Sequence, residues 1–218
     1  MLVGMIPSRP AVPLATLQTT LNRHGFVAHV ASSRAEVVPL VLERILPDTG
    51  ARHFAAGGSM TFDVFKPELL SALAARGLVY SDNHEPGVSW PELVERRRAS
   101  LLTDLFFTGV NAVTAHGQLV SLDATGNRIA AMLFGPKHVV VLAGRNKIVP
   151  DLAAAKERVR RVAPLNAKRL GFATPCVAAG RCVDCSSPAR ICNAWAVVER
   201  PFPAGRIHVV LIDDDLGL

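Results

Sequence analysis

Hydrophobic residues recur along this chain in two patterns, one with helical spacing and one in short continuous runs. Residues 11–24 show the helical pattern, which stops at Gly25, and residues 26–30 form the first apolar run. Further apolar runs occupy residues 52–56, 78–81, 138–143, 195–199 and 207–212. Runs of this length bounded by polar turns indicate buried strands, whereas spacings of three and four indicate helices. Strands that alternate with helices predict an α/β fold, with a mainly parallel sheet flanked by helices.

Helix boundaries follow from capping residues and prolines. Two pairs have the spacing of a capping box: Ser33 with Glu36, and Ser89 with Glu92. Asp151 is a good N-cap for the apolar stripe behind it, and Pro67 is expected to open a helix that ends at Gly77. Residues 104–121 are β-rich, and residues 123–128 are expected to form a turn before a short apolar run.

The length of 218 residues and the hydrophobic content of 50% suit a single α/β domain over residues 1–218. No apolar run approaches the roughly 20 residues that span a bilayer, so no membrane span is expected. The opening residues lack the pattern of a secretory leader. A cytoplasmic location is therefore expected, in which the cysteines stay reduced.

The net charge of +6 raises the question of nucleic acid as a partner. The basic runs 96–98 and 158–161 follow glutamates in predicted helices, and both are interpreted as solvated helix faces. Aromatic residues make up only 6% of the chain and do not alternate with basic ones, as base stacking requires. Nucleic acid is not an expected partner.

The loops that follow strands are where an open α/β sheet binds ligands. Gly57, Gly58 and Ser59 leave a predicted strand and precede a helix, so their N–H groups are placed to hold a phosphate or carboxylate. The segment is neither a Walker sequence nor a complete dinucleotide fingerprint, and an ordinary strand-to-helix turn remains the alternative.

Four more residues with suitable chemistry follow other strands. Asn111 is placed to orient a ligand by hydrogen bonds, and Arg128 and Lys147 supply positive charge. Asp123 is the best-placed carboxylate for a general base or nucleophile. Turns favour Asp and Asn for backbone reasons alone, so a structural role for Asp123 is the competing interpretation.

Several motifs occur in a characteristic order. They are the Gly-Gly-Ser-Met-Thr loop at residues 57–61, Thr-Gly-x-Asn-Ala-x-Thr at 108–114, Gly-Gln-Leu-Val at 117–120, Thr-Gly-Asn-Arg at 125–128, Phe-Gly-Pro-Lys at 134–137 and Asn-Lys-Ile-Val at 146–149. Together they resemble the LUD domain family of the lactate-utilisation protein C type, from about residue 57 to the end. Residues 60–65 depart from the Glu-Ile-Gly-like sequence expected after the glycine loop.

The resemblance implies a fold similar to ribose-5-phosphate isomerase and CoA-transferases, and a link to bacterial lactate oxidation beside iron–sulfur partner subunits. Three functions stay open. The first is binding of a small anionic metabolite or nucleotide in support of carboxylate oxidation. The second is a sugar-phosphate isomerase or acyl-CoA transferase that uses Asp123. The third is a non-catalytic iron–sulfur electron-transfer or assembly subunit.

All the cysteines of the chain lie in one loop-like segment, residues 172–194. They are Cys176, Cys182, Cys185 and Cys192. Four thiolates this close in sequence are candidate ligands for zinc or for an iron–sulfur cluster. The spacing matches neither a zinc ribbon nor a ferredoxin, so the metal is not specified, and free thiols or disulfides remain alternatives. Within the resembling family, this segment marks a branch distinct from the lactate-operon protein.

Overall fold

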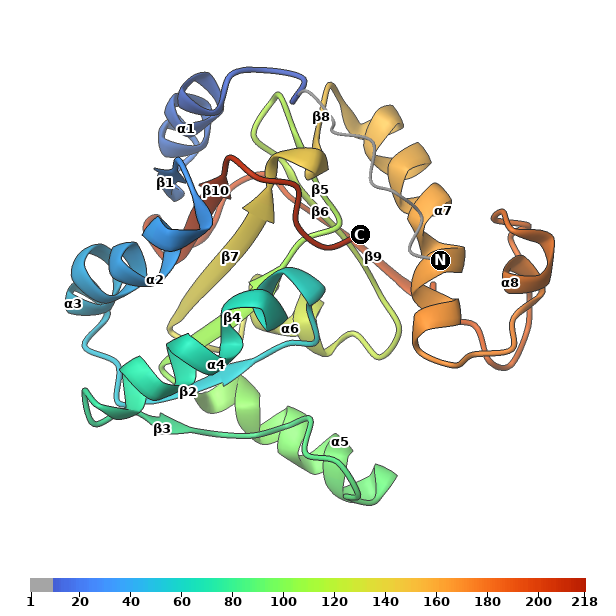
Figure 1. Ribbon diagram of the computed structural model, residues 1–218, viewed down its shortest axis with the longest axis horizontal. Helices are drawn as coiled ribbons and strands as arrows, with labels where there is room; N and C mark the ends of the chain where they lie inside the picture. The colour runs from blue at the N-terminus through green and yellow to red at the C-terminus, as the bar shows by residue number, and fades with distance from the viewer. Residues whose placement is uncertain (1–9) are drawn as a thin grey trace.

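The computed structural model describes residues 10–218, which form two β-sheets with helices packed around them (Figure 1). Residues 1–9 of the predicted domain lie outside the described residues. The larger sheet has six strands in the order β1-β10-β7-β4-β2-β3, and every neighbouring pair in it is parallel. Its strands are β1 (Val27–Ala31), β2 (His53–Ala56), β3 (Val79–Tyr80), β4 (Leu105–Gly109), β7 (His138–Gly144) and β10 (Ile207–Ile212). The predicted α/β fold with a mainly parallel sheet is confirmed.

Both faces of this sheet are buried, which explains its continuous apolar runs. Alternate residues of the central strands, among them Phe107 and Val140, pack against α2 (Val37–Leu40), α3 (Leu46–Thr49) and α4 (Met60–Ala74). The residues between them face α1 (Leu14–Arg23) and the smaller sheet. Shorter helical segments are the 3-10 turns Arg34–Glu36, Ser100–Leu102 and Arg145–Lys147, and the π-helix Val41–Ile45.

The smaller sheet has four strands in the order β8-β5-β6-β9 and was not predicted as a separate layer. Its strands are β5 (Ala112–Thr114), β6 (Leu119–Asp123), β8 (Ile148–Val149) and β9 (Ala194–Val198). One face packs on the larger sheet, and the other packs on α7 (Leu152–Arg169) through Ala112, Val120 and Ala155. The β-rich stretch 104–121 is therefore divided between two sheets.

Two helices differ from the predictions: one begins earlier than expected, and the other was not predicted. Helix α4 begins at Met60 and contains Pro67 in its interior, because Ser59 caps it by accepting the N–H of Phe62 at 3.3 Å. The short apolar run after residue 126 forms helix α6 (Asn127–Leu133). The glycine loop is consequently joined directly to a helix N-terminus.

The remaining helices, α5 (Trp90–Ala99) and α8 (Pro175–Ala179), lie at the periphery (Figure 1). Ser89 caps α5 as predicted, since its Oγ accepts the Glu92 N–H at 3.4 Å. Ser33 makes no such cap; the Glu36 carboxylate accepts the Ser32 N–H instead, at 2.8 Å. No helix within residues 10–218 has both the length and the apolar character to cross a bilayer.

Candidate functional site

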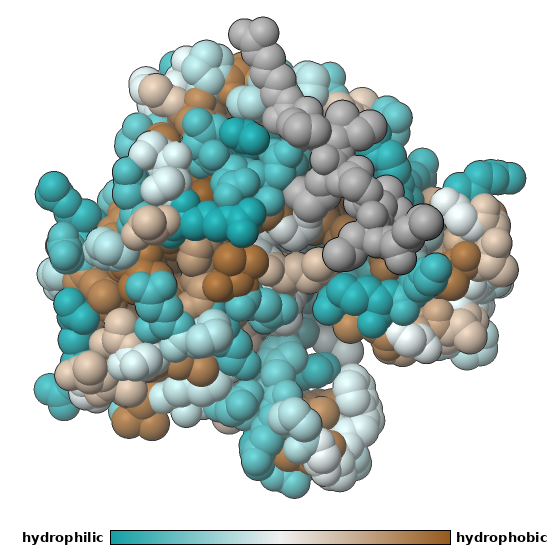
Figure 2. Space-filling view, viewed as in Figure 1, coloured by the Kyte–Doolittle hydropathy of each residue, from teal (hydrophilic) through white to brown (hydrophobic). Residues whose placement is uncertain are grey.

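A cleft of about 650 Å³ opens beside the carboxyl ends of β2, β4 and β6. Its walls come from the N-terminus of α4, from α5, from the turn between β6 and α6, and from the end of α7. Figure 2 shows the surface hollowed between the lobe that contains α5 and the lobe that contains α7 and α8. For β2 and β4 this position follows from the fold, because the loops after parallel strands meet at one edge of the sheet.

All the predicted ligand-site residues line this one cleft. They are Gly57, Gly58, Ser59, Asn111, Asp123, Arg128 and Lys147. Of the four cysteines, Cys192 lines the cleft and the other three do not. The structure thus joins seven residues from four loops, whose separation in sequence reaches 90 positions, in a single concave surface.

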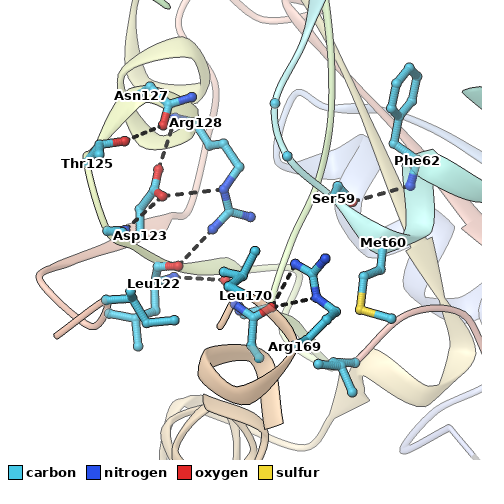
Figure 3. A pocket seen from close by; sticks show the side chains of 18 of the residues that line it. Ser59, Met60, Phe62, Leu122, Asp123, Thr125, Asn127, Arg128, Arg169 and Leu170 are labelled. Carbon is cyan, nitrogen blue, oxygen red and sulfur yellow. Dashed lines mark hydrogen bonds and ion pairs between the residues drawn. The ribbon is translucent and has the colours of Figure 1, made fainter. Parts of the chain in front are cut away.

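The glycine loop brings backbone and side chains unusually close together. A Cβ on Gly57 would lie 2.6 Å from Cγ of Arg128, and a Cβ on Gly109 would collide with Oγ of Ser59. Glycine at both positions therefore permits the contact between the first turn of α4 and the neighbouring strand ends. The α4 N-terminus, with Ser59 and Met60, faces the cleft (Figure 3).

Asp123 is held by backbone hydrogen bonds at the start of α6. Its carboxylate accepts the N–H groups of Ala124 at 2.9 Å, Arg128 at 3.0 Å and Ile129 at 3.4 Å. The Arg128 Nε lies 3.5 Å from the same carboxylate, and its Nη2 donates to the carbonyl of Leu122 at 2.8 Å (Figure 3). This geometry favours the structural interpretation of Asp123, and its catalytic role stays a prediction.

Hydrogen bonds of Asn111 and Arg158 connect the loop between β4 and β5 to α7. The Asn111 Oδ1 accepts the Leu122 N–H at 2.9 Å, and its carbonyl accepts Nη1 of Arg158 at 2.6 Å. Arg158 also donates from Nε to the carbonyl of Asn146 at 3.0 Å. The interpretation of residues 158–161 as a solvated face is wrong for Arg158, which is 6% exposed. Burial lowers the pKa of this guanidinium to about 10, so it keeps its charge.

Lys147 lies at the base of the cleft with 4% of its surface exposed. Its Nζ donates to Oγ1 of Thr61 at 2.7 Å, and none of the ion pairs within residues 10–218 includes it. Burial, reinforced by the positive charges of Arg158 and Arg128, lowers the Lys147 pKa from 10.5 to about 7. Near neutral pH this amine therefore exists in both charged and uncharged forms.

Three further cations line the cleft that sequence patterns did not point to. They are Lys66 from α4, Arg97 from α5 and Arg169 from the end of α7. The Arg97 guanidinium lies 5.2 Å from the centre of the Trp90 ring, and its Nε is buried without a hydrogen-bond partner among the described residues. Arg169 donates to Oδ1 of Asn166 at 2.9 and 3.2 Å, and Figure 3 shows it between Ser59 and the start of α6. Residues 96–98 form a basic run, but nothing in that run distinguishes Arg97 from its neighbours.

Two titratable groups of the cleft are shifted towards their neutral forms. Burial raises the pKa of the Asp63 carboxyl, against the opposing charges of Lys66 and Arg169. Burial and the charge of Arg97 lower the pKa of His84, which favours a neutral imidazole at pH 7. Both shifts weaken the charged form of the group concerned.

The cysteine segment forms a wall of the cleft next to the β6–α6 turn. Asn193 joins the two, because its N–H donates to the Asp123 carbonyl at 3.1 Å and its Nδ2 to the Ala124 carbonyl at 3.1 Å. Arg190 organises the segment by donating to the carbonyls of Cys185 and Cys192. All four cysteines are free thiols, and no three His, Cys, Asp or Glu side chains within residues 10–218 are arranged to hold a metal ion.

The structure is an α/β domain with a cleft, lined by lysine and arginine side chains, beside the carboxyl ends of three of its strands. The chain matches the LUD domain family over residues 14–212 and belongs to that family. A crystal structure of a DUF162 family protein from Deinococcus radiodurans is similar to this fold, with a TM-score of 0.53. The two share 16% sequence identity over 91% of this chain and 95% of the other. A search of curated proteins found no match.

Proposed function

We propose that the protein binds a small anionic metabolite or nucleotide in this cleft. The observation that carries the proposal is the charge of the lining, which contains five lysine and arginine side chains and two carboxylate side chains. One of the two carboxylates, Asp123, is already engaged by three backbone N–H groups and by Arg128. An anion is the ligand that neutralises the remaining charge, and the N-terminus of α4 adds a further favourable field.

The volume and the apolar lining agree with a ligand of metabolite or nucleotide size. Ligand pockets typically have about 300–1,000 Å³, and this cleft has about 650 Å³. Trp90, Tyr80 and Phe172 line it together with the charged groups. Such a mixture suits a molecule that carries both an anionic group and an apolar or aromatic portion.

Thermal shift and native mass spectrometry test this proposal with lactate, phosphosugars, nucleotides and CoA esters. Arg169→Gln removes a cleft cation that donates hydrogen bonds to Asn166. Binding should weaken roughly tenfold, as expected for the loss of one charge-assisted hydrogen bond. Arg160→Gln is the matched control, since Arg160 lies on the same helix, is exposed and does not line the cleft. The proposal fails if no anion shifts the melting temperature, or if both substitutions weaken binding equally.

We further propose that this binding serves bacterial lactate or carboxylate oxidation beside iron–sulfur partner subunits. What supports this is membership of the LUD domain family, together with a cleft lined by lysine and arginine side chains. The alternative, a sugar-phosphate isomerase or acyl-CoA transferase, requires a reactive carboxylate. Asp123 is less suited to that role because its oxygens accept three N–H groups. Asp123→Asn should abolish turnover if the alternative is right, and unchanged turnover would eliminate this role.

Metal binding by the four cysteines also stands as a proposal. The spacing of the cysteines in the sequence supports it. So does the closeness of the other three thiols to Cys192: burial is the largest cause of the raised pKa of Cys192, and these thiols raise it further. As arranged, the segment does not present a ligand set, so it would have to close around the ion. Anaerobic purification with metal analysis tests whether the cysteines bind a metal and which one. About four iron atoms per chain and absorbance at roughly 400 nm would favour the iron–sulfur subunit. A zinc content near one would favour a structural site instead.

A further inference from the structure

We propose that Lys147 is a nucleophile that forms an imine with the carbonyl group of an anionic ligand. The ligand class is a carbonyl compound that also carries a carboxylate or phosphate, such as a 2-oxo acid. This inference rests on the proposed anion binding in the cleft and adds to it a covalent step at a named atom.

The position of Lys147 is the first observation. It follows β7 in the short 3-10 turn Arg145–Lys147, so its side chain enters the cleft from the same edge of the sheet as the glycine loop. It is 4% exposed, yet it belongs to the cleft lining. A lysine whose function is only solubility keeps its amine in water, and burial of this group needs another explanation.

The partners of the amine are the second observation. Nζ of Lys147 donates to Oγ1 of Thr61 at 2.7 Å, and that hydroxyl in turn donates to the carbonyl of Leu216 at 3.3 Å. No carboxylate within residues 10–218 forms an ion pair with Lys147. A buried structural lysine is normally paired with a carboxylate. A single hydroxyl acceptor leaves the nitrogen lone pair available once the amine is neutral.

The charges around the amine act in the same direction. Arg158 from α7 and Arg128 from α6 both disfavour a second positive charge at Lys147, in addition to the effect of burial. Neighbouring cations and a dry environment are two of the ways in which proteins activate a lysine nucleophile. Arg128 and Arg169 line the same cleft, so the cleft contains cations that can bind an anionic group of the ligand.

The chemistry balances without an oxidant or a reductant. The Lys147 nitrogen adds to the carbonyl carbon, and one of its protons passes to the carbonyl oxygen to give a carbinolamine. Loss of that oxygen as water, with a proton taken from solvent, leaves the protonated imine. The positive charge of this imine then replaces that of the lysine ammonium at the same position.

Reductive trapping tests the inference. The full chain is incubated at pH 7 with pyruvate and cyanoborohydride, and the labelled lysines are identified by peptide mass spectrometry over time. Lys147 should be labelled roughly tenfold faster than the exposed Lys168, because its lower pKa leaves far more of the amine neutral. Lys66, which also lines the cleft, is the control for simple proximity to a bound anion. Lys147→Met, confirmed as folded by circular dichroism, should lose the label.

The outcomes separate this inference from the proposed function. Labelling of Lys147 no faster than that of Lys168, or preferential labelling of Lys66, overturns the role of Lys147 as nucleophile. If pyruvate or inorganic phosphate still raises the melting temperature, anion binding survives that result. If neither raises it and Lys147 is unlabelled, both proposals fail.

Discussion

The buried amine of Lys147 makes a quantitative prediction about folding stability. In the unfolded chain its pKa is 10.5, and in the folded protein it is about 7. Between these values the unfolded state binds more protons, so stability rises with pH across that window. The shift corresponds to a cost of about 4 kcal/mol at pH 7, which falls to about 2 kcal/mol at pH 9. The wild type should therefore gain about 2 kcal/mol between pH 7 and pH 9 from this group.

The perturbation is Lys147→Met, which keeps the length of the side chain and removes the titration. Urea unfolding followed by circular dichroism gives the free energy of unfolding of both proteins at pH 7 and pH 9. Comparing the two proteins cancels the contribution of every group that titrates alike in both. If the two proteins show the same change with pH, the buried amine is not depressed and the reasoning is refuted. Saturating phosphate should reduce the difference, because a bound anion favours the charged amine.

Three other predictions concern the frame of the site. His208 is buried and stacked on His29, and burial lowers its pKa to about 4. As the pH falls, His208 is therefore protonated in the unfolded state before it is protonated in the folded state. Stability should drop by about 2 kcal/mol between pH 7 and pH 5 in urea unfolding, and a smaller drop in His208→Gln would attribute the effect to this residue. Gly109→Ala should cost about 1–3 kcal/mol because the added methyl meets Oγ of Ser59. Ser59→Ala alone should cost about 1 kcal/mol, and strictly additive costs in the double variant would argue against the collision. Asp123→Ala should lower the melting temperature by removing the acceptor of three N–H groups, with a loss of about 1–2 kcal/mol, and no change would contradict its capping role.

The residues that the sequence pointed to as a ligand site line one cleft, and strand direction in the larger sheet explains part of this. Gly57 and Lys147 follow β2 and β7, which are parallel strands of the larger sheet, so strand polarity brings these two loops to one edge. Asp123 ends β6 of the smaller sheet, and it reaches the cleft because the two sheets pack together. Whether they bind the anion that we propose is a separate question for the binding experiments. The sequence pattern did not distinguish a catalytic Asp123 from a capping one, because the same carboxylate suits both roles until its neighbours are known.

Other members of the cleft had no local signal. Arg97 and Arg169 belong to helices far apart in the chain, and each resembles the solvated arginines beside it. Their positions in the cleft depend on where α5 and α7 lie in the folded chain. The buried position of Arg158 is likewise decided by the carbonyls of Asn111 and Asn146 that it bridges.

The sequence by itself determined the α/β class, most strand positions and the capping of helices such as α5, because apolar period and capping chemistry are local properties. It also contained the ordered motifs that mark the LUD domain family. Only the tertiary structure decided the division into two sheets, since strand pairing depends on contacts between distant segments. It also decided that Lys147 is buried beside Thr61 without a carboxylate, and hence that its amine is neutral for part of the time at pH 7. Charge and burial of a side chain are set by everything that packs around it, and a sequence pattern does not record them.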